Sequence, residues 1–314
     1  MIELADIRAA AERIAGTVVR TPLVRLHVEG PAEIWLKLEN LQPIGSFKLR
    51  GAGNAMALAG SERLANGVYT ASAGNMAQGV AWCARELGIA CHVVAPDHAP
   101  RAKLDAIARL GAETILVPFA EWWEVIERHS YPGLDGLFIH PVCDPAVIAG
   151  NGTIGLEIVE DLPDVDAVLV PYGGGGLSTG IATALSALVP DARIYGCEVA
   201  TAAPLAASFA AGKPAAVDYE PSFVDGIGGR AVLDEMWPHV SQLLDGALVC
   251  ELQEVRDALR LLAMRAHVIA EGAGACPVAA ALSGQAEGAK LVCVVSGGNI
   301  DASVLAPILA NGLS

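Results

Sequence analysis

The spacing of hydrophobic side chains along the chain predicts alternating strands and helices. Residues 34–39 alternate between apolar and polar side chains, as a half-buried strand does. From residue 67 onward the pattern changes to short apolar runs, each followed by a glycine-containing turn and then by a longer amphipathic run. Strands that alternate with helices of ten or more residues indicate right-handed βαβ units with parallel strands. The pattern therefore predicts an α/β fold.

Two series of these units follow one another, separated by a less regular stretch. The expected strands lie at residues 34–39, 68–71, 90–95, 114–117, 167–171, 193–198 and 291–295. The expected helices lie at residues 4–15, 47–58, 76–87, 101–110, 154–160, 177–188 and 254–267, with further helices after residues 271 and 299. Residues 118–140 form an irregular connection. A second irregular stretch, interrupted by Pro and Gly, follows the strand at residues 193–198 and runs to residue 221. A domain boundary near residues 140–150 gives a large domain of residues 1–66 and 144–314 and a small domain of residues 67–143.

Composition and charge predict a soluble protein of the cytoplasm. The 314 residues suit one large domain or two of ordinary size, and 53% of them are hydrophobic. The formal charge of -15 repels phosphate backbones and anionic lipids, so neither a nucleic acid nor a membrane is expected as a partner. The N-terminus lacks the features of a signal peptide, and the apolar runs are too short to span a bilayer. Seven scattered cysteines without a Cys-x-x-Cys pair argue against disulfides and zinc and fit a reducing compartment.

The first candidate for chemistry is a lysine in a turn that opens into a helix. Pro43 and Gly45 form the turn in residues 41–52, and Lys48 falls in the first helical turn. A cation there opposes the helix macrodipole, which helps to keep the amine neutral and therefore nucleophilic. The alternative is that Lys48 extends its charge into solvent, as most lysines do. This stretch by itself does not decide between the two.

Three glycine-containing turns follow apolar strands, at residues 72–75, 173–176 and 296–299. The carboxyl ends of parallel strands are where ligands bind, and small residues let backbone N–H groups approach an anion at a helix N-terminus. Tight turns also need glycine for their own geometry, but four consecutive glycines exceed that need. The sequence at residues 173–180 fits neither the Walker pattern nor the strict G-x-G-x-x-G spacing of dinucleotide-binding proteins. Glu198 lies where a ribose-binding acid would follow, so dinucleotide binding stays open as an alternative.

These motifs resemble, in order, those of one enzyme group. Residues 45–52 (GSFKLRGA), 72–75 (SAGN), 173–177 (GGGGL) and 296–299 (SGGN) look like the fold type II pyridoxal-phosphate enzymes. The likeness covers nearly the whole chain and is closest to the serine/threonine dehydratase (threonine deaminase) and serine racemase group. It implies two open parallel-sheet βαβ domains, as in the tryptophan synthase β-like fold, with the cofactor in the cleft between them. It also implies a homodimer and a small amino-acid substrate.

The resemblance assigns roles to particular residues. Lys48 would form the internal Schiff base with pyridoxal 5'-phosphate, and Phe47 would pack against the ring. Asn75 would bind the ring hydroxyl of the cofactor, and Ser296 would bind its pyridine nitrogen. The phosphate would be bound by Gly173, Gly174, Gly175, Gly176 and Leu177. The substrate carboxylate would bind at Ser72, Ala73, Gly74 and Asn75. A hydroxyl beside the pyridine nitrogen gives a weaker electron sink than a carboxylate, which suits β-elimination.

The implied reaction is the dehydration of a β-hydroxy amino acid such as L-threonine or L-serine to a 2-oxo acid and ammonia, with the neutral Lys48 amine as base at the α-carbon. Alternatives on the same fold are a hydroxyaspartate- or phenylserine-like substrate, a serine racemase and a β-replacement enzyme. A nucleotide-binding protein without catalysis is the alternative outside the fold.

The sequence departs from the group's pattern at three points. Ala73 replaces the serine that is the second acid/base of serine racemases, so dehydration is expected to exceed racemisation. Met76 replaces a histidine, which is either a packing change or a more apolar substrate pocket. The group's divalent-cation site is half present: Glu198 matches its first carboxylate and Ala202 could give a carbonyl, but Pro204 replaces the second carboxylate.

Overall fold

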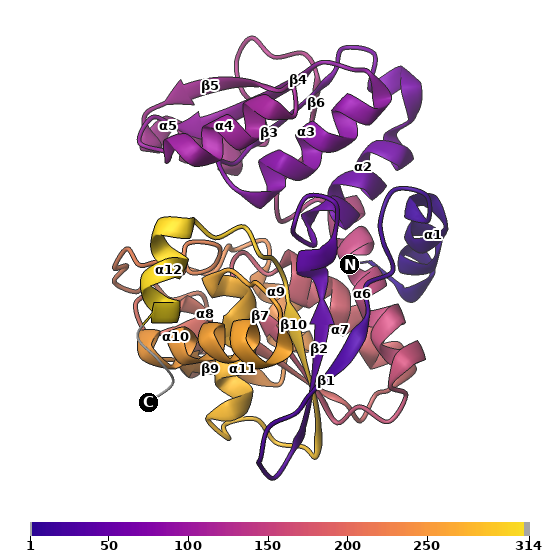
Figure 1. The fold of residues 1–314 in the computed structure, drawn as a ribbon. Helices are drawn as coiled ribbons and strands as arrows, with labels where there is room; N and C mark the ends of the chain where they lie inside the picture. Colours follow the sequence, from indigo (N-terminus) through magenta and orange to yellow (C-terminus); the bar gives the residue numbers. More distant parts are fainter. Residues whose placement is uncertain (1, 311–314) are drawn as a thin grey trace.

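A computed structural model describes residues 2–310, and its core is two separate sheets with helices packed against them (Figure 1). The larger sheet has six strands in the order β1-β2-β10-β7-β8-β9. All neighbours in it are parallel except the hairpin pair β1 and β2. Its strands are β1 (Leu23–Leu26), β2 (Glu33–Leu38), β7 (Ala167–Pro171), β8 (Arg193–Val199), β9 (Gly246–Cys250) and β10 (Lys290–Val295).

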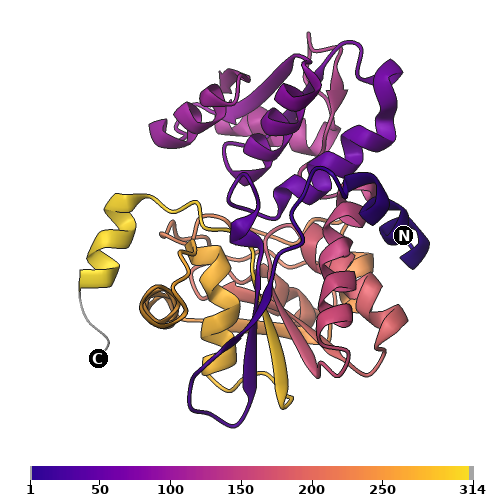
Figure 2. The same ribbon diagram turned by 45° about the vertical axis from the view of Figure 1, so that its right-hand side comes forward.

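The smaller sheet is entirely parallel, with the order β5-β4-β3-β6. Its strands are β3 (Val68–Ala71), β4 (Cys91–Pro96), β5 (Glu113–Val117) and β6 (Leu137–Phe138). The two views in Figures 1 and 2 show this sheet and its helices above the larger sheet, with the chain rising from β2 into α2.

The helices connect the strands as crossovers, as the alternating pattern predicts. The α-helices are α1 (Leu4–Ile14), α2 (Lys48–Arg63), α3 (Asn75–Leu87), α4 (Arg101–Arg109), α5 (Phe119–Arg128), α6 (Pro145–Asp161), α7 (Gly176–Leu188), α8 (Pro204–Ala211), α9 (Trp237–Leu243), α10 (Leu252–Leu261), α11 (Gly272–Leu282) and α12 (Ala302–Ala310). A short 3₁₀ turn, η1 (Glu39–Leu41), follows β2, and a π-helical turn, η2 (Leu262–Ala266), follows α10. Within residues 2–310 no helix combines the length and apolar character needed to span a bilayer.

Close helix packing places α2 between the two sheets. A Cβ on Gly150 of α6 would lie 2.4 Å from the carbonyl oxygen of Arg50 in α2, and one on Gly180 of α7 would lie 2.4 Å from that of Ile148 in α6. Glycine therefore allows three helices to approach to backbone contact. The opposite face of α2 buries Leu49 and Met56 in the hydrophobic core of the smaller sheet.

Several connecting segments contain regular structure that the hydrophobic pattern missed. The stretch of residues 118–140 contains α5 and β6, and the region after β8 contains α8, α9 and β9. Helix α6 begins at residue 145 rather than 154, because its glycines serve close packing instead of breaking the helix. The strands β6 and β9 and the helices α8 and α9 are short, so their periodicity is weak.

Candidate active site

Lys48 begins α2 with its side chain half-buried and its amine directed at the backbone of a distant segment. The Nζ atom donates a hydrogen bond of 2.9 Å to the carbonyl oxygen of Pro141 and lies 5.0 Å from the centre of the Phe47 ring. Burial lowers the pKa of Lys48 to about 8, and the negative charge of Glu271 acts in the opposite direction. A substantial fraction of the amine is therefore neutral in mildly alkaline solution, as a nucleophile or base requires.

Backbone pairing with the end of β10 fixes the turn before Lys48. The Phe47 N–H donates to the carbonyl oxygen of Ser296 at 2.9 Å, and the Gly298 N–H donates to that of Gly45 at 2.9 Å. A β-bridge joins Ser46 to Gly297 between these two bonds. The lysine turn and the turn at residues 296–299, which the sequence singled out separately, are thus paired backbone to backbone.

The four-glycine turn lies against the same segment that holds the lysine amine. A Cβ on Gly174 would lie 2.5 Å from Cγ2 of Val142, and one on Gly176 would lie 2.6 Å from its carbonyl oxygen. Gly175 has a φ of +97°, a conformation that favours glycine. The turn therefore needs glycines both for its backbone conformation and for its contact with Val142.

His140 is a structural residue that holds this segment in place, through contacts that the sequence did not predict. Its Nδ1 atom accepts hydrogen bonds from the N–H groups of Val142 and Cys143 at 3.0 and 2.8 Å, and Nε2 lies 3.2 Å from the carbonyl oxygen of Ile126. Burial lowers the pKa of His140 to about 4, and nearby His129 acts in the same direction. The ring is therefore neutral, with Nδ1 as acceptor and Nε2 as donor.

The turn at residues 72–75 contributes Asn75, the first residue of α3. Its amide nitrogen donates to Oε1 of Glu271 at 2.8 Å, and its amide oxygen accepts from Asn299 at 2.8 Å. Burial raises the pKa of Glu271 to about 7, and the Asn75 hydrogen bond opposes this shift. In the same turn, Oγ of Ser72 accepts a hydrogen bond from the Gly74 N–H at 3.1 Å.

Met76, next in the chain, points away from these groups into the core of the smaller sheet. It is 1% exposed and belongs to the apolar cluster that contains Leu49 and Val80. This position supports the interpretation of Met76 as a packing residue.

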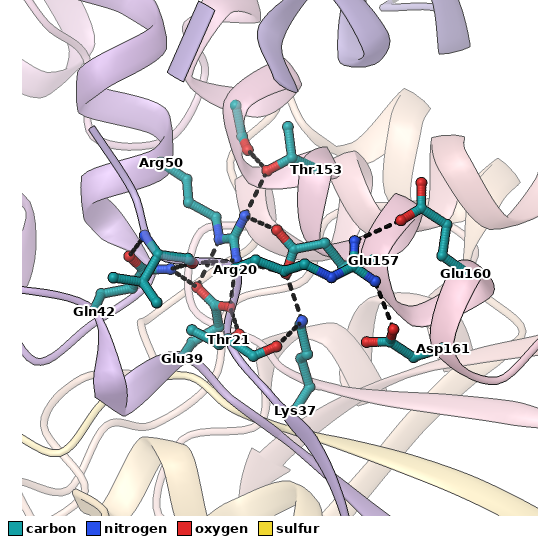
Figure 3. A network of polar contacts seen from close by, with 12 residues as sticks. Arg20, Thr21, Lys37, Glu39, Gln42, Arg50, Thr153, Glu157, Glu160 and Asp161 are labelled. Carbon is teal, nitrogen blue, oxygen red and sulfur yellow. Dashed lines mark hydrogen bonds and ion pairs between the residues drawn. The ribbon is translucent and has the colours of Figure 1, made fainter. Parts of the chain in front are cut away.

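A buried ionic network anchors α2 just after Lys48 (Figure 3). The Arg50 guanidinium donates two hydrogen bonds to Glu39, at 2.7 and 2.8 Å, and two to Glu157 on α6, at 2.7 and 2.9 Å. Lys37 on β2 pairs with the same Glu157 carboxylate and donates to the carbonyl oxygen of Thr21. The network ties α2 to β2 and α6 of the larger sheet, and its bidentate geometry makes it directional.

Glu198 has structural partners in place of a cation. Its two carboxylate oxygens accept the N–H groups of Leu205 and Ala206 in the first turn of α8, at 2.8 and 2.9 Å. Burial raises the pKa of Glu198 to about 7, against the effect of these hydrogen bonds. Across residues 2–310 no three His, Cys, Asp or Glu side chains gather as metal ligands. In this structure the Glu198 carboxylate therefore binds a helix N-terminus, and the cation site at Glu198 and Ala202 stays a prediction.

Comparison with known protein families identifies the family of this chain. The profile of the family described as "Pyridoxal-phosphate dependent enzyme" matches residues 14–297. The chain belongs to this family. L-threonine ammonia-lyase of Thermotoga maritima is 42% identical to it over 320 aligned residues, which cover 100% of this chain and 79% of the relative.

Two solved structures of the family resemble the chain over nearly all of its length. A threonine deaminase from T.th. has a TM-score of 0.86 and 36% identity, covering 96% of this chain and 99% of that one. Maize serine racemase has a TM-score of 0.89 and 33% identity, covering 98% of this chain and 97% of that one. The expected fold type II group, its α/β fold, the pyridoxal-phosphate cofactor and a lyase of the dehydratase class are confirmed. The interpretation as a dinucleotide-binding protein is set aside.

The residues present fit pyridoxal phosphate. Helix α7 starts at Gly176 without a side-chain cap, so its first N–H groups are available to a phosphate. The Tyr172 hydroxyl beside Gly175 is buried and has no hydrogen-bond partner among the described residues, which fits a polar group bound at this turn. Leu177 and Ser296, two more of the predicted contacts, are also buried.

Proposed function

We propose that this chain is an ammonia-lyase that converts L-threonine or L-serine to the corresponding 2-oxo acid and ammonia. The observation that carries the proposal is the Lys48 amine, with its lowered pKa, held beside a glycine turn suited to a phosphate. Relatives named for threonine deamination support the choice of substrate. The position of Met76 supports it too. Met76 replaces the group's histidine but is buried in the core, so this replacement gives no reason to expect a different substrate.

The chain's residues divide the work as follows. Bound pyridoxal phosphate supplies the electrophile and electron sink for cleavage at the β-carbon. Lys48 would hold the cofactor covalently, and its amine, when free and neutral, would accept the α-proton. Phe47 would pack against the ring, and Ser296 would offer the ring nitrogen a neutral hydroxyl. Asn75 would donate to the ring oxygen.

Two turns bind the anionic groups in this proposal. The N–H groups of residues 173–177 would hold the phosphate at the start of α7. In the turn of residues 72–75 the N–H groups of Ala73 and Asn75 would hold the substrate carboxylate, since the N–H groups of Ser72 and Gly74 donate to the Val94 carbonyl oxygen and to Ser72 Oγ. Both helices begin without a side-chain cap, so their first N–H groups are free for a ligand.

Three further expectations, about assembly, location and domain division, belong to the same proposal. We propose a homodimer, a cytoplasmic location, and a division into a large domain of residues 1–66 and 144–314 and a small domain of residues 67–143. The separate sheets support the division, although α2 shares the core of the smaller sheet. Free thiols, six of them buried, support a reducing compartment.

A panel of β-hydroxy amino acids tests the substrate assignment. We expect 2-oxo acid release to be fastest with L-threonine or L-serine and at least about tenfold slower, in kcat/KM, with phenylserine or hydroxyaspartate. Higher kcat/KM with either bulkier or acidic substrate would overturn the assignment. Incorporation of an added thiol into the product, in place of 2-oxo acid release, would instead identify a β-replacement enzyme.

Ala73 gives a second prediction, on reaction specificity. Alanine has no transferable proton, so we expect 2-oxo acid release to exceed enantiomer interconversion. Ala73→Ser introduces a hydroxyl in the same turn and should raise the ratio of racemisation to dehydration by about tenfold or more. Chiral chromatography of the remaining substrate measures this ratio. A wild-type protein that racemises as fast as it dehydrates would contradict the prediction.

A further inference from the structure

Asn299 joins the three turns that the sequence singled out. It lies at the end of the turn at residues 296–299, and its amide nitrogen donates to the carbonyl oxygen of Ile44 at 2.8 Å. The same nitrogen donates its second hydrogen to Oδ1 of Asn75 at 2.8 Å. Asn75 in turn donates to Oε1 of Glu271 at 2.8 Å. A chain of three hydrogen bonds therefore runs from the lysine turn, through Asn299 and Asn75, to a buried carboxyl group.

The directions of these bonds follow from chemistry. The carbonyl oxygen of Ile44 can only accept, so the NH₂ group of Asn299 must face it. That orientation directs the second hydrogen of the NH₂ group at Asn75, which must present its oxygen. The NH₂ group of Asn75 then faces Glu271, whose carboxylate accepts. The backbone oxygen at one end of the chain thus determines which atom of Asn75 faces the site.

The Asn299 amide packs closely against the lysine turn at Gly45. A Cβ on Gly45, which has a φ of +73°, would lie only 2.6 Å from Oδ1 of Asn299. The absence of a side chain at position 45 is what lets the Asn299 amide lie flat against the lysine turn. The backbone bond from the Gly298 N–H to Gly45 keeps the two turns together.

We propose that Asn299 is a positioning residue that holds the Asn75 amide with its NH₂ group toward the cofactor site. The Asn75 nitrogen has two hydrogens, so it can serve Glu271 with one and a ring oxygen of the bound cofactor with the other. Asn299 makes Asn75 a donor there and prevents it from presenting its oxygen. The inference rests on the proposed role of Asn75 as a cofactor contact, and it names Asn299 as the residue that orients the Asn75 amide for that role.

Asn299→Asp tests the proposal with almost no change in shape. Aspartate only accepts, so the Asn75 amide should rotate to donate to it, which leaves the Asn75 oxygen facing Glu271 and the site. We expect pyridoxal phosphate to bind about tenfold or more weakly, as loss of one hydrogen bond to a charged group predicts. In an Asn75→Ala background the same substitution should change the dissociation constant by less than about twofold, because Asn299 acts through Asn75. An equal loss in both backgrounds would overturn the proposal.

A second measurement needs no cofactor. The chain has seven asparagines, so in apoprotein labelled with ¹⁵N-asparagine the Asn75 side-chain resonance can be assigned by its loss in Asn75→Ala. Glu271→Gln should shift this resonance in the otherwise wild-type protein and shift it several times less in Asn299→Asp, where the NH₂ group faces residue 299. Equal shifts in both proteins would overturn the proposal. If the resonance behaves as expected while Asn75→Ala leaves cofactor affinity unchanged, the positioning is correct and the cofactor contact assigned to Asn75 is wrong.

Discussion

Lys48→Ala should abolish 2-oxo acid formation and remove the visible absorbance of the lysine-bound cofactor. The substitution deletes both the covalent attachment and the base at the α-carbon. Loss of the base by itself accounts for a fall of about 10²–10⁴-fold in turnover. The folded structure should survive, since within residues 2–310 the side chain makes a single hydrogen bond, to the carbonyl oxygen of Pro141. Steady-state assays of 2-oxo acid release on protein saturated with pyridoxal phosphate measure the effect.

Lys290→Ala is the matched control for this experiment. Lys290 pairs with Asp164 at the far end of β10 from the site, and both side chains are partly exposed. An exposed pair contributes about 0–1 kcal/mol, so turnover and absorbance should stay at the wild-type level. Turnover retained in Lys48→Ala would show that another group carries the chemistry.

The second large effect is expected on stability, from Glu39→Gln. Glu39 is fully buried and its carboxylate pairs with Arg50 while accepting the Thr21 hydroxyl. Glutamine keeps the shape but leaves the buried guanidinium short of one negative charge. Breaking a buried pair in this way costs about 3–5 kcal/mol in the free energy of unfolding. Urea unfolding of the cofactor-loaded protein measures it, and Arg101→Ala, which breaks an exposed pair with Asp105, should cost less than about 1 kcal/mol.

The cost of Glu39→Gln should depend on pH in a defined direction. Burial raises the pKa of Glu39, but the charge and hydrogen bonds of Arg50 outweigh it, so the pKa lies below its ordinary value. A carboxyl with a lowered folded-state pKa stabilises the protein above its unfolded pKa of about 4.3, and this stabilisation is lost as the pH falls through the folded-state pKa. The difference between wild type and variant should therefore be constant near neutrality and shrink below about pH 4. A difference that stays constant into acid would contradict the assigned charge state.

Local patterns in the sequence were sufficient for much of the fold. The period-two run at residues 34–39, the apolar strands and the glycine turns each depend on neighbours in sequence, and their elements agree with the structure within a few residues. Elements such as α5 and β9 were missed because their stability comes from distant packing. Helix α5, for example, buries only Val125 and Ile126 against the smaller sheet.

The site could be predicted as a set of motifs but not as a geometry. Nothing near Lys48 in sequence announces that Pro141, ninety-three residues away, accepts its amine. The hydrogen bonds of Glu198 to the first turn of α8 could equally not be read from the residues around Glu198. Contacts of this kind depend on how the two sheets and α2 are placed together.

Reduction with borohydride followed by peptide mass mapping tests the central claim most directly. The chain has five lysines, and the proposal is that pyridoxal phosphate is attached to Lys48 and to none of the others. After reduction of the cofactor-loaded protein, the peptide that contains Lys48 should carry one stoichiometric equivalent of the reduced cofactor, and its unmodified form should be absent. A cofactor fixed at Lys37, Lys103, Lys213 or Lys290, or no fixed cofactor in a protein that still turns over substrate, would contradict the account.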